Sequence, residues 1–252
     1  SDVCSSDLDA AFTPYASWSS AFETPTTTEL NARPDGAGGF NPDLGPQRVR
    51  TVEGGTRGRV GTLSYALSVF ESYADDAIIQ YLALDGRSFF RNAGRTRHRG
   101  VELGVQWQVT SWLSATSSWT EADYRFVDYR VPRGAVTDTL DGKHEAGVPG
   151  RVVRVGMDAR LGAATFSLDH TWSDAQYADD KNTQRVDGYG PGVLNLRAGW
   201  SGNAGTVHWA PFVGVNNAMD RAYVGAVTIN GASGRSEEHT SELQSRFGIS
   251  YA

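Results

Sequence analysis

The sequence has one cysteine, two lysines and no long apolar segment, and each absence excludes a class of protein. A single cysteine, Cys4, excludes a fold held together by disulfide bonds. No run of residues approaches the ~18 apolar residues of a membrane-spanning helix. Because the net charge is −6 and the basic residues form no cluster, nucleic-acid binding is not expected. Frequent aromatic, serine and threonine residues favour an all-β fold.

Two segments have sequences that indicate sequencing artefacts rather than native protein. Residues 235–245, RSEEHTSELQS, match the translation of a common short-read sequencing adapter, and residues 1–8, SDVCSSDL, match that of its reverse complement. Because both strands of one oligonucleotide are present, we predict that both segments, Cys4 included, are adapter artefacts. An acidic, solvated loop is the alternative interpretation. The native chain then comprises one β-domain over residues 9–234 and a final strand over residues 246–252.

Apolar and polar residues alternate with a period of two through most of the remaining chain. The alternation is clearest in VELGVQWQV, residues 101–109, and in ATFSLDHTW, residues 164–172. It predicts strands with one apolar and one polar face, the polar face meeting water. The residues predicted to point outward include Leu103, Val105, Phe166 and Leu168, whereas Gln106 and Ser167 are predicted on the opposite face.

The lengths of the connections predict how the strands are joined. We expect ten strands, at residues 13–23, 47–57, 59–83, 88–109, 112–125, 151–161, 164–177, 192–201, 206–216 and 246–252. Short turns at Gly58, Thr110-Ser111, Gly162-Ala163 and 201–205 alternate with long loops at 24–46, 126–150, 178–191 and 217–245. Short turns on one rim and long loops on the other are typical of an outer-membrane β-barrel. The exception, a tight tip at Asp85-Gly86, joins strands long enough to project beyond a membrane.

Tryptophans are spaced as two interfacial belts. Trp107 and Trp112 flank one short turn, and Trp200 and Trp209 flank another. Trp119 and Trp172 follow their turns by eight or nine residues. Because a tilted strand crosses a bilayer in about 9–11 residues, these two are expected at the far interface. Core tryptophans of a soluble β-sandwich are the alternative.

No motif for catalysis or metal binding is apparent. The five histidines lack the spacing of metal ligands, and neither a GxSxG motif nor a phosphate-binding loop occurs. We therefore predict that the protein is not an enzyme and has no catalytic residue, metal site or cofactor. The paired aspartates at 75–76 and 179–180 are expected on a solvated rim.

The basic residues are the best candidates for binding a substrate. Arginine matches carboxylate and phosphate groups in bidentate geometry, which would suit an anionic ligand. The candidate substrate-binding residues are Arg130, Arg133, Lys143, Arg151, Arg154 and Arg185. The alternative is that these residues pair with carboxylates on neighbouring strands or with an anionic outer leaflet.

Four stretches, in order, resemble one family of proteins. They are PYAS to FETP at 14–25, NPDL at 41–44 with Glu53 and Gly55, NAG at 92–94 with RGVE at 99–102, and VNNAMDR at 215–221 with Tyr223. Together these stretches resemble the C-terminal part of the β-barrel of a TonB-dependent outer-membrane receptor.

The resemblance implies a barrel of about 22 antiparallel strands in the outer membrane of a Gram-negative bacterium, of which this chain supplies about ten. It also implies a plug, absent here, through which a TonB-type complex energises uptake of ferric siderophore-type chelates. The fragment alone is then expected to be inactive and to aggregate or need detergent. A passive porin or autotransporter-type barrel and a soluble all-β binding domain are the alternatives.

Overall fold

The computed structural model describes residues 11–31, 33, 39–82, 87–92, 94–133, 136–190, 192–225, 227 and 229. Both predicted adapter segments and the predicted last strand, residues 246–252, lie outside these ranges. Within the described ranges, no helix is long and apolar enough to span a membrane.

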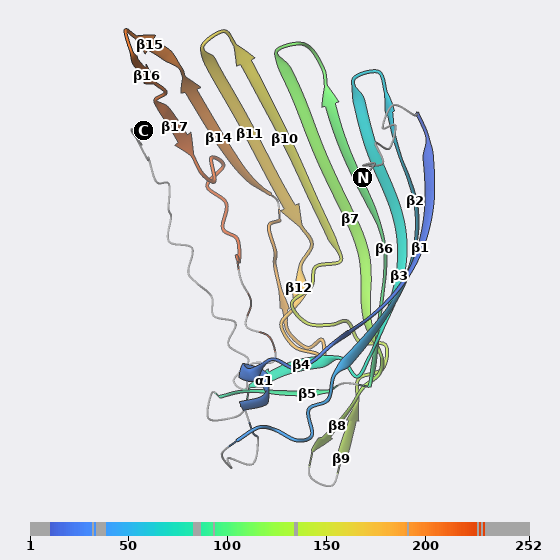
Figure 1. Cartoon of the computed structure of the whole chain (residues 1–252). Helices are drawn as coiled ribbons and strands as arrows, with labels where there is room; N and C mark the ends of the chain where they lie inside the picture. The colour runs from blue at the N-terminus through green and yellow to red at the C-terminus, as the bar shows by residue number, and fades with distance from the viewer. Residues whose placement is uncertain are drawn as a thin grey trace.

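One antiparallel sheet of nine strands, in the order β1-β2-β3-β6-β7-β10-β11-β14-β17, forms most of the structure. Its strands are β1 (Thr13–Glu23), β2 (Gln47–Val60), β3 (Leu63–Asp75), β6 (Arg95–Gln108), β7 (Leu113–Asp128), β10 (Arg151–Leu161), β11 (Ala164–Ser173), β14 (Val193–Trp200) and β17 (Phe212–Val215). The sheet is curved and, among the described residues, open, with β1 and β17 at its edges (Figure 1). The predicted all-β, antiparallel fold is confirmed.

The remaining elements are short and lie outside the main sheet. They are α1 (Thr27–Asn31) and four hairpins: β4 (Ile78–Leu82) with β5 (Ser88–Asn92), β8 (Arg130–Arg133) with β9 (Val136–Thr139), β12 (Gln176–Tyr177) with β13 (Arg185–Val186), and β15 (Gly202–Ala204) with β16 (Val207–Trp209). All except β15–β16 lie at the end of the sheet that carries the long loops (Figure 1). Helix α1 and the hairpin β8–β9 fall in segments predicted as loops.

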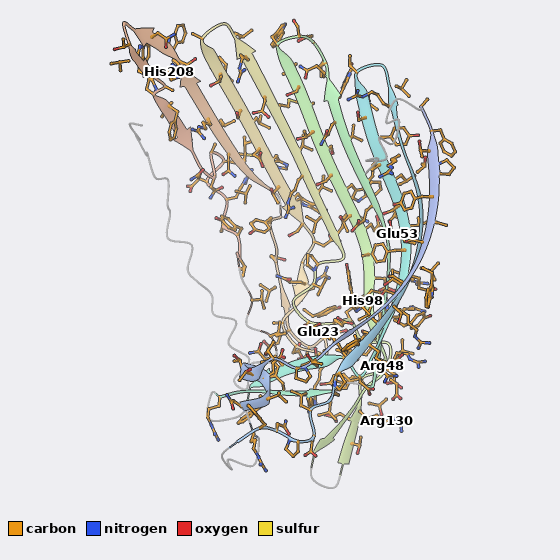
Figure 2. All side chains as sticks on the ribbon, viewed as in Figure 1. Glu23, Arg48, Glu53, His98, Arg130 and His208 are labelled. Atoms are coloured by element: carbon orange, nitrogen blue, oxygen red, sulfur yellow. The ribbon has the colours of Figure 1, made fainter. Side chains whose placement is uncertain are left out.

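The two kinds of connection are on opposite rims, as predicted. The strand register brings the connections 61–62, 109–112 and 162–163 to one end of the sheet, which we call the turn rim. The connections that follow β1, β3, β7 and β11 lie at the other end, the loop rim (Figure 1). Figure 2 labels His208 at the turn rim and Arg48, His98 and Arg130 towards the loop rim.

One of the predicted turns is displaced by three residues. Gly58 is inside β2, opposite Tyr65, and the turn is at Gly61, where φ is +60°. The predicted turn at 201–205 contains the tip of its hairpin, Gly205, where φ is +64°, although Gly202 is already paired with Trp209 in β15. Each of these tips needs a left-handed residue, which glycine adopts at little cost. The prediction at Gly58 was wrong because the segment also contains Gly61.

The predicted strands 59–83 and 88–109 are not continuous in the structure. β3 ends at Asp75, and Asp76 has a left-handed φ of +56°. The amide of Asp76 donates to the carbonyl of Gly94 at 2.8 Å, so the chains remain paired at the break. Beyond it, β4 and β5 form their own sheet beside α1 (Figure 1).

The two faces of the sheet differ as the alternation predicts. One row across six strands contains only apolar side chains: Leu63, Trp107, Ala115, Met157, Leu168 and Leu196. The adjacent row contains Ser64, Gln106, Thr116, Gly156, Asp169 and Asn195. Leu103, Val105, Phe166 and Leu168 therefore share one face, and Gln106 and Ser167 lie on the other. Trp119 and Trp172 lie in one row, separated by Val153, as an interfacial belt requires.

The buried apolar cluster lies at the loop rim rather than in the middle of the sheet. It contains Ala74, Ala77, Phe126, Tyr129, Val131 and Leu140. The rings of Phe126 and Tyr129 are 4.6 Å apart, and each residue is only 1% exposed. This cluster packs the loops that follow β3 and β7 onto the sheet.

Candidate functional site

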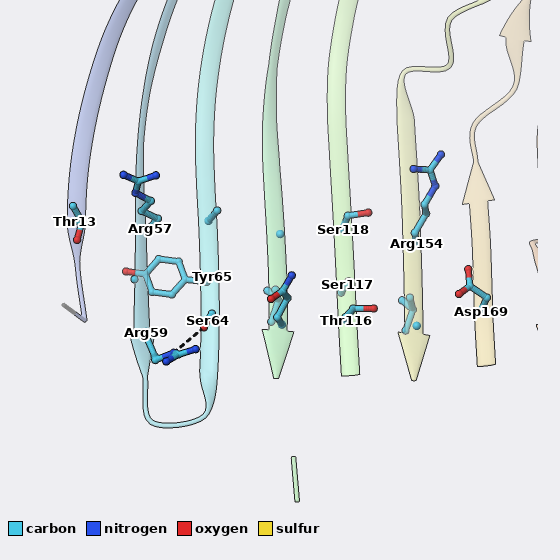
Figure 3. A pocket seen from close by; sticks show the side chains of 17 residues that line it. Thr13, Arg57, Arg59, Ser64, Tyr65, Thr116, Ser117, Ser118, Arg154 and Asp169 are labelled. Atoms are coloured by element: carbon cyan, nitrogen blue, oxygen red, sulfur yellow. Dashed lines mark hydrogen bonds between the residues drawn. The ribbon is translucent and has the colours of Figure 1, made fainter. Parts of the chain in front are cut away.

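The polar face encloses a hollow of about 710 Å³ that extends from β1 to β11. Arg57, Arg154 and Asp169 contribute to its lining, and Figure 3 shows them on separate strands. Arg57 and Arg154 lie in one cross-strand row, and the side chains between them are those of Ala66, Gly104 and Ser118. Because these side chains are small, the row has space between its two arginines.

The lining of this hollow has an excess of positive charge. It includes the guanidinium groups of Arg57, Arg59 and Arg154, and Asp169 is the acidic residue among the described lining residues. Nε of Arg59 donates to Oγ of Ser64 at 3.2 Å (Figure 3). Guanidinium groups bind carboxylate or phosphate oxygens through two parallel hydrogen bonds. The hollow is therefore suited to an anionic group.

A second hollow, of about 570 Å³, continues along the same face towards β17. The guanidinium of Arg197 lies 3.8 Å from the ring centre of Phe212, in the geometry of a cation–π contact. Oγ of Ser167 donates to Oδ1 of Asp158 at 2.6 Å. Arg154 and Arg197 are both on this face.

Four of the six candidate residues lie in the loop-rim segments. Arg130 begins β8, is largely exposed, and has its Nε 3.5 Å from Oδ1 of Asp128. Arg133 ends β8, and its side chain is outside the described part of the chain. Lys143 is exposed in the loop after β9, and Arg185 is exposed at the start of β13.

The other two candidates lie on opposite faces of β10. Arg154 lines the hollow on the polar face. Arg151 lies on the apolar side, opposite Glu121, whose Oε2 is 3.3 Å from its Nε without the alignment of a hydrogen bond. The structure therefore places one of the six in the polar hollow, and it does not gather the six into one site.

Arg57 and Arg59 were not among the candidates, although the sequence contained a signal for them. Both belong to the polar set of the alternation if β2 continues past Gly58. The turn predicted at Gly58 placed Arg59 in a different strand from Arg57, so the prediction missed that the two arginines share one face.

A second group of polar side chains lies on the same face near the loop rim. Nε2 of His98 is 2.7 Å from Oε1 of Glu145 and 3.1 Å from Oγ1 of Thr96. The rings of His98 and Tyr124 are 4.7 Å apart. These contacts fix the loop that follows β9 against β6 and β7. No group of three potential metal ligands is found among the described residues.

His144 anchors the same loop and has a pH-sensitive environment. Its amide donates to Oδ1 of Asn182 at 2.7 Å, and its ring stacks on Tyr177 at 5.7 Å. Burial lowers the pKa of His144 below the ordinary 6.5, and the charge of Arg125 lowers it further, whereas Asp123 raises it.

We therefore expect the attachment of this loop to weaken on acidification. A lowered pKa means that the unfolded loop binds the proton more readily, so the contribution of His144 to stability is complete above about pH 6.5 and is lost as the pH falls through the folded pKa. Hydrogen exchange at the amide of His144 should accelerate over this range, beyond the intrinsic pH effect. In His144→Gln that extra dependence should disappear; its persistence would mean that another group is responsible.

Comparisons with known proteins agree with this architecture. A family model described as TonB dependent receptor-like, beta-barrel, matches residues 7–218. A ferrioxamine receptor of Yersinia enterocolitica is 28% identical over 141 residues, which are 55% of this chain and 19% of that protein. The chain thus spans about a fifth of the length of this relative.

Two solved structures, of a ferric citrate transporter and a ferric yersiniabactin uptake receptor, have the same fold. The ferric citrate transporter FecA in its unliganded form matches with a TM-score of 0.66 at 19% identity, over 97% of this chain and 34% of that one. The ferric yersiniabactin uptake receptor FyuA of Yersinia pestis matches with a TM-score of 0.65 at 20% identity, over 89% of this chain and 32% of that one.

Proposed function

Because the chain belongs to the TonB-dependent receptor-like β-barrel family, we propose that it forms part of the barrel wall of an outer-membrane receptor that actively imports a ferric siderophore-type chelate. We call the complete protein of this proposal the parent receptor. Its energy comes from a TonB-type partner that contacts a region outside this chain, and the chain alone does not transport. The family's barrels lie in the outer membrane of Gram-negative bacteria.

The observation that carries the proposal is the cationic hollow on the polar face. A passive, weakly selective pore needs no concentration of charge of one sign. A receptor for an anionic chelate needs a few hydrogen-bond donors at defined positions. Arg57 and Arg154 provide such donors on the face that is directed away from lipid. Of the six candidates, Arg154 is therefore the first to test for chelate binding; Arg130, Arg133, Lys143 and Arg185 are candidates for capture at the loop rim, and Arg151 is the least favoured.

The test is iron uptake by cells that express the parent receptor as their only receptor for ferric chelates. Radioactive iron is offered as the chelates named for the relatives: ferrioxamine, citrate and yersiniabactin. We expect saturable uptake of one of them that stops when the TonB-type partner is deleted. Arg154→Gln should raise the apparent KM at least about tenfold, because losing a charged hydrogen bond costs about 1.5–3 kcal/mol.

Arg160→Gln is the matched control, since Arg160 is on the same strand and face but closer to the turn rim. Its KM should stay within about twofold of the wild type, because the substitution is outside the main hollow. Uptake that is linear in chelate concentration and independent of the partner would identify a passive barrel and reject the proposal. Equal effects of the two substitutions would remove Arg154 as a binding residue and leave the proposal of active transport intact.

A further inference from the structure

The apolar face of the sheet becomes strongly charged near the loop rim. On β6 the outward residues Leu103 and Val101 are followed on the same face by Arg99 and Arg97. On β7 Trp119 is followed by charged residues in the same way. The outward arginines of β2, β6 and β7 are Arg48, Arg50, Arg95, Arg97, Arg99 and Arg125, which we call the arginine belt. Figure 2 labels Arg48 within this region.

The belt carries a net positive charge although the whole chain is acidic. Its outward acids are Glu71, Asp75, Glu121, Asp123 and Asp128, five against the six arginines. The middle cross-strand row contains Arg50, Tyr73, Arg97 and Arg125 and no acid. The excess charge is therefore concentrated around that row.

Asp123 is the centre of the most crowded part of the belt. Its Oδ1 is 2.7 Å from Nε of Arg125, and its Oδ2 is 3.5 Å from Nη2 of Arg99 and 3.9 Å from Nη2 of Arg97. Glu71 is opposite Arg99, and its Oε1 accepts from the hydroxyl of Tyr73 at 3.3 Å. A single carboxylate thus faces three guanidinium groups.

Some N–H groups of Arg97, Arg99 and Arg125 have no hydrogen-bond acceptor among the described residues. Nε of Arg97 is buried and has no hydrogen-bond partner there, and Nη2 of Arg97 approaches Oδ2 of Asp123 only to 3.9 Å. The side chain of Arg99 is 56% exposed and that of Arg125 is 37% exposed. The exposed parts of the Arg99 and Arg125 guanidinium groups therefore remain available to a further anion on the outer surface.

The position of the cluster relative to the apolar band fixes the kind of anion. Arg99 is two residues beyond Val101, the last apolar residue on the outward face of β6, which is about 7 Å along a strand. The headgroup layer of a bilayer extends about 5–8 Å beyond its hydrocarbon core. The acyl chains that cover Leu103 and Trp119 would therefore bring their own headgroups to Arg99.

We propose that Arg97, Arg99 and Arg125 bind a phosphate group of an anionic lipid in the outer leaflet. Guanidinium groups bind phosphate oxygens in bidentate fashion, and the adjacent apolar band holds the acyl chains. The proposal rests on the membrane position of the barrel and not on the chelate it transports, so either proposal can fail without the other.

The test measures lipid binding to the purified parent receptor in detergent by native mass spectrometry. The probes are diphosphoryl lipid A and the same lipid without its phosphates. We expect the phosphorylated lipid to bind at least about tenfold more tightly, and Arg97→Gln/Arg99→Gln/Arg125→Gln to abolish that preference. The control is Arg57→Gln/Arg59→Gln/Arg160→Gln, which removes the same charge from the polar face and should retain it.

A third variant separates binding from structural support. Asp123→Asn removes the internal competitor of the phosphate and should bind the phosphorylated lipid at least as tightly as the wild type, whereas a purely structural cluster would lose binding. Equal affinity of the wild type for both lipids would overturn the proposal. Displacement by an equal concentration of inorganic phosphate would also overturn it, because the site would then take a free anion rather than a lipid.

Discussion

Replacement of Leu168 by arginine should destabilise the parent receptor in lipid vesicles by about 2–4 kcal/mol, the cost of an arginine at the bilayer midplane on the lipid side of a barrel. Leu168 lies midway along β11, between Ala164 at the turn rim and Trp172 at the expected far interface. Its cross-strand neighbours on the apolar face are Met157 and Leu196. No carboxylate of this row is available to pair with the new charge.

Ser167→Arg is the matched control, one residue away and on the opposite face. Ser167 is opposite Asp158, whose carboxylate already accepts its hydroxyl at 2.6 Å, so an arginine there finds a partner and water. We expect a change of less than about 1 kcal/mol. Denaturant unfolding in vesicles, followed by tryptophan fluorescence, measures both variants. If Ser167→Arg were the more damaging of the two, the assignment of the faces, and with it the membrane interpretation, would be wrong.

The second large effect on stability is expected at the buried apolar cluster of the loop rim. Phe126→Ala removes a ring that is 1% exposed and 4.6 Å from the ring of Tyr129, and such a truncation costs about 3–5 kcal/mol. The backbone of Phe126 bonds to Gly142 and Lys143 at 2.8 and 3.0 Å, so the cluster and the loop should open together. The loss should therefore appear as local unfolding of residues 126–150.

Limited proteolysis and amide hydrogen exchange of the parent receptor measure this opening. Val127→Ala is the control, because Val127 is the next residue and 40% exposed. Its exchange rates should change by less than about threefold, since surface truncations usually cost within about 0.5 kcal/mol. Accelerated exchange in the sheet strands rather than in residues 126–150 would show that the cluster supports the sheet, contrary to our expectation.

Much of the sheet could be predicted because strand faces are a local property. The alternation in residues 101–109 and 164–172 determines which side chains share a face, whatever the partner strand is. The alternation of short and long connections likewise determines that Gly162 and the 126–150 loop lie on opposite rims. The spacing of Trp119 and Trp172 from their turns was sufficient to place them in one belt.

The positions of turns and breaks depended on longer-range contacts. Judged from the neighbouring sequence, Gly58 and Gly61 could each form the turn. Only the pairing of β2 with β3 selects Gly61 as the left-handed residue. Nothing local marks Asp76 as the end of β3, because its conformation is stabilised by the bond from its amide to Gly94, a residue 18 positions away. The helix α1 is likewise attached at the loop rim by a bond from the amide of Asn41 to the carbonyl of Leu30.

The sequence by itself determined the fold class, the two faces of the sheet, the two rims and the family resemblance. Periodicity, connection length and motifs depend only on residues that are close together in the sequence. Only the tertiary structure decided which charges meet. Arg57 and Arg154 are 97 positions apart and line one hollow, at the two ends of a row of small side chains, whereas Arg151, three residues from Arg154, has the opposite face and a glutamate partner. Three arginines converge on Asp123 through the register of β6 with β7. Charge clusters in a sheet depend on the cross-strand register. The register pairs residues that are far apart in the sequence, so the local sequence does not indicate which charges will meet.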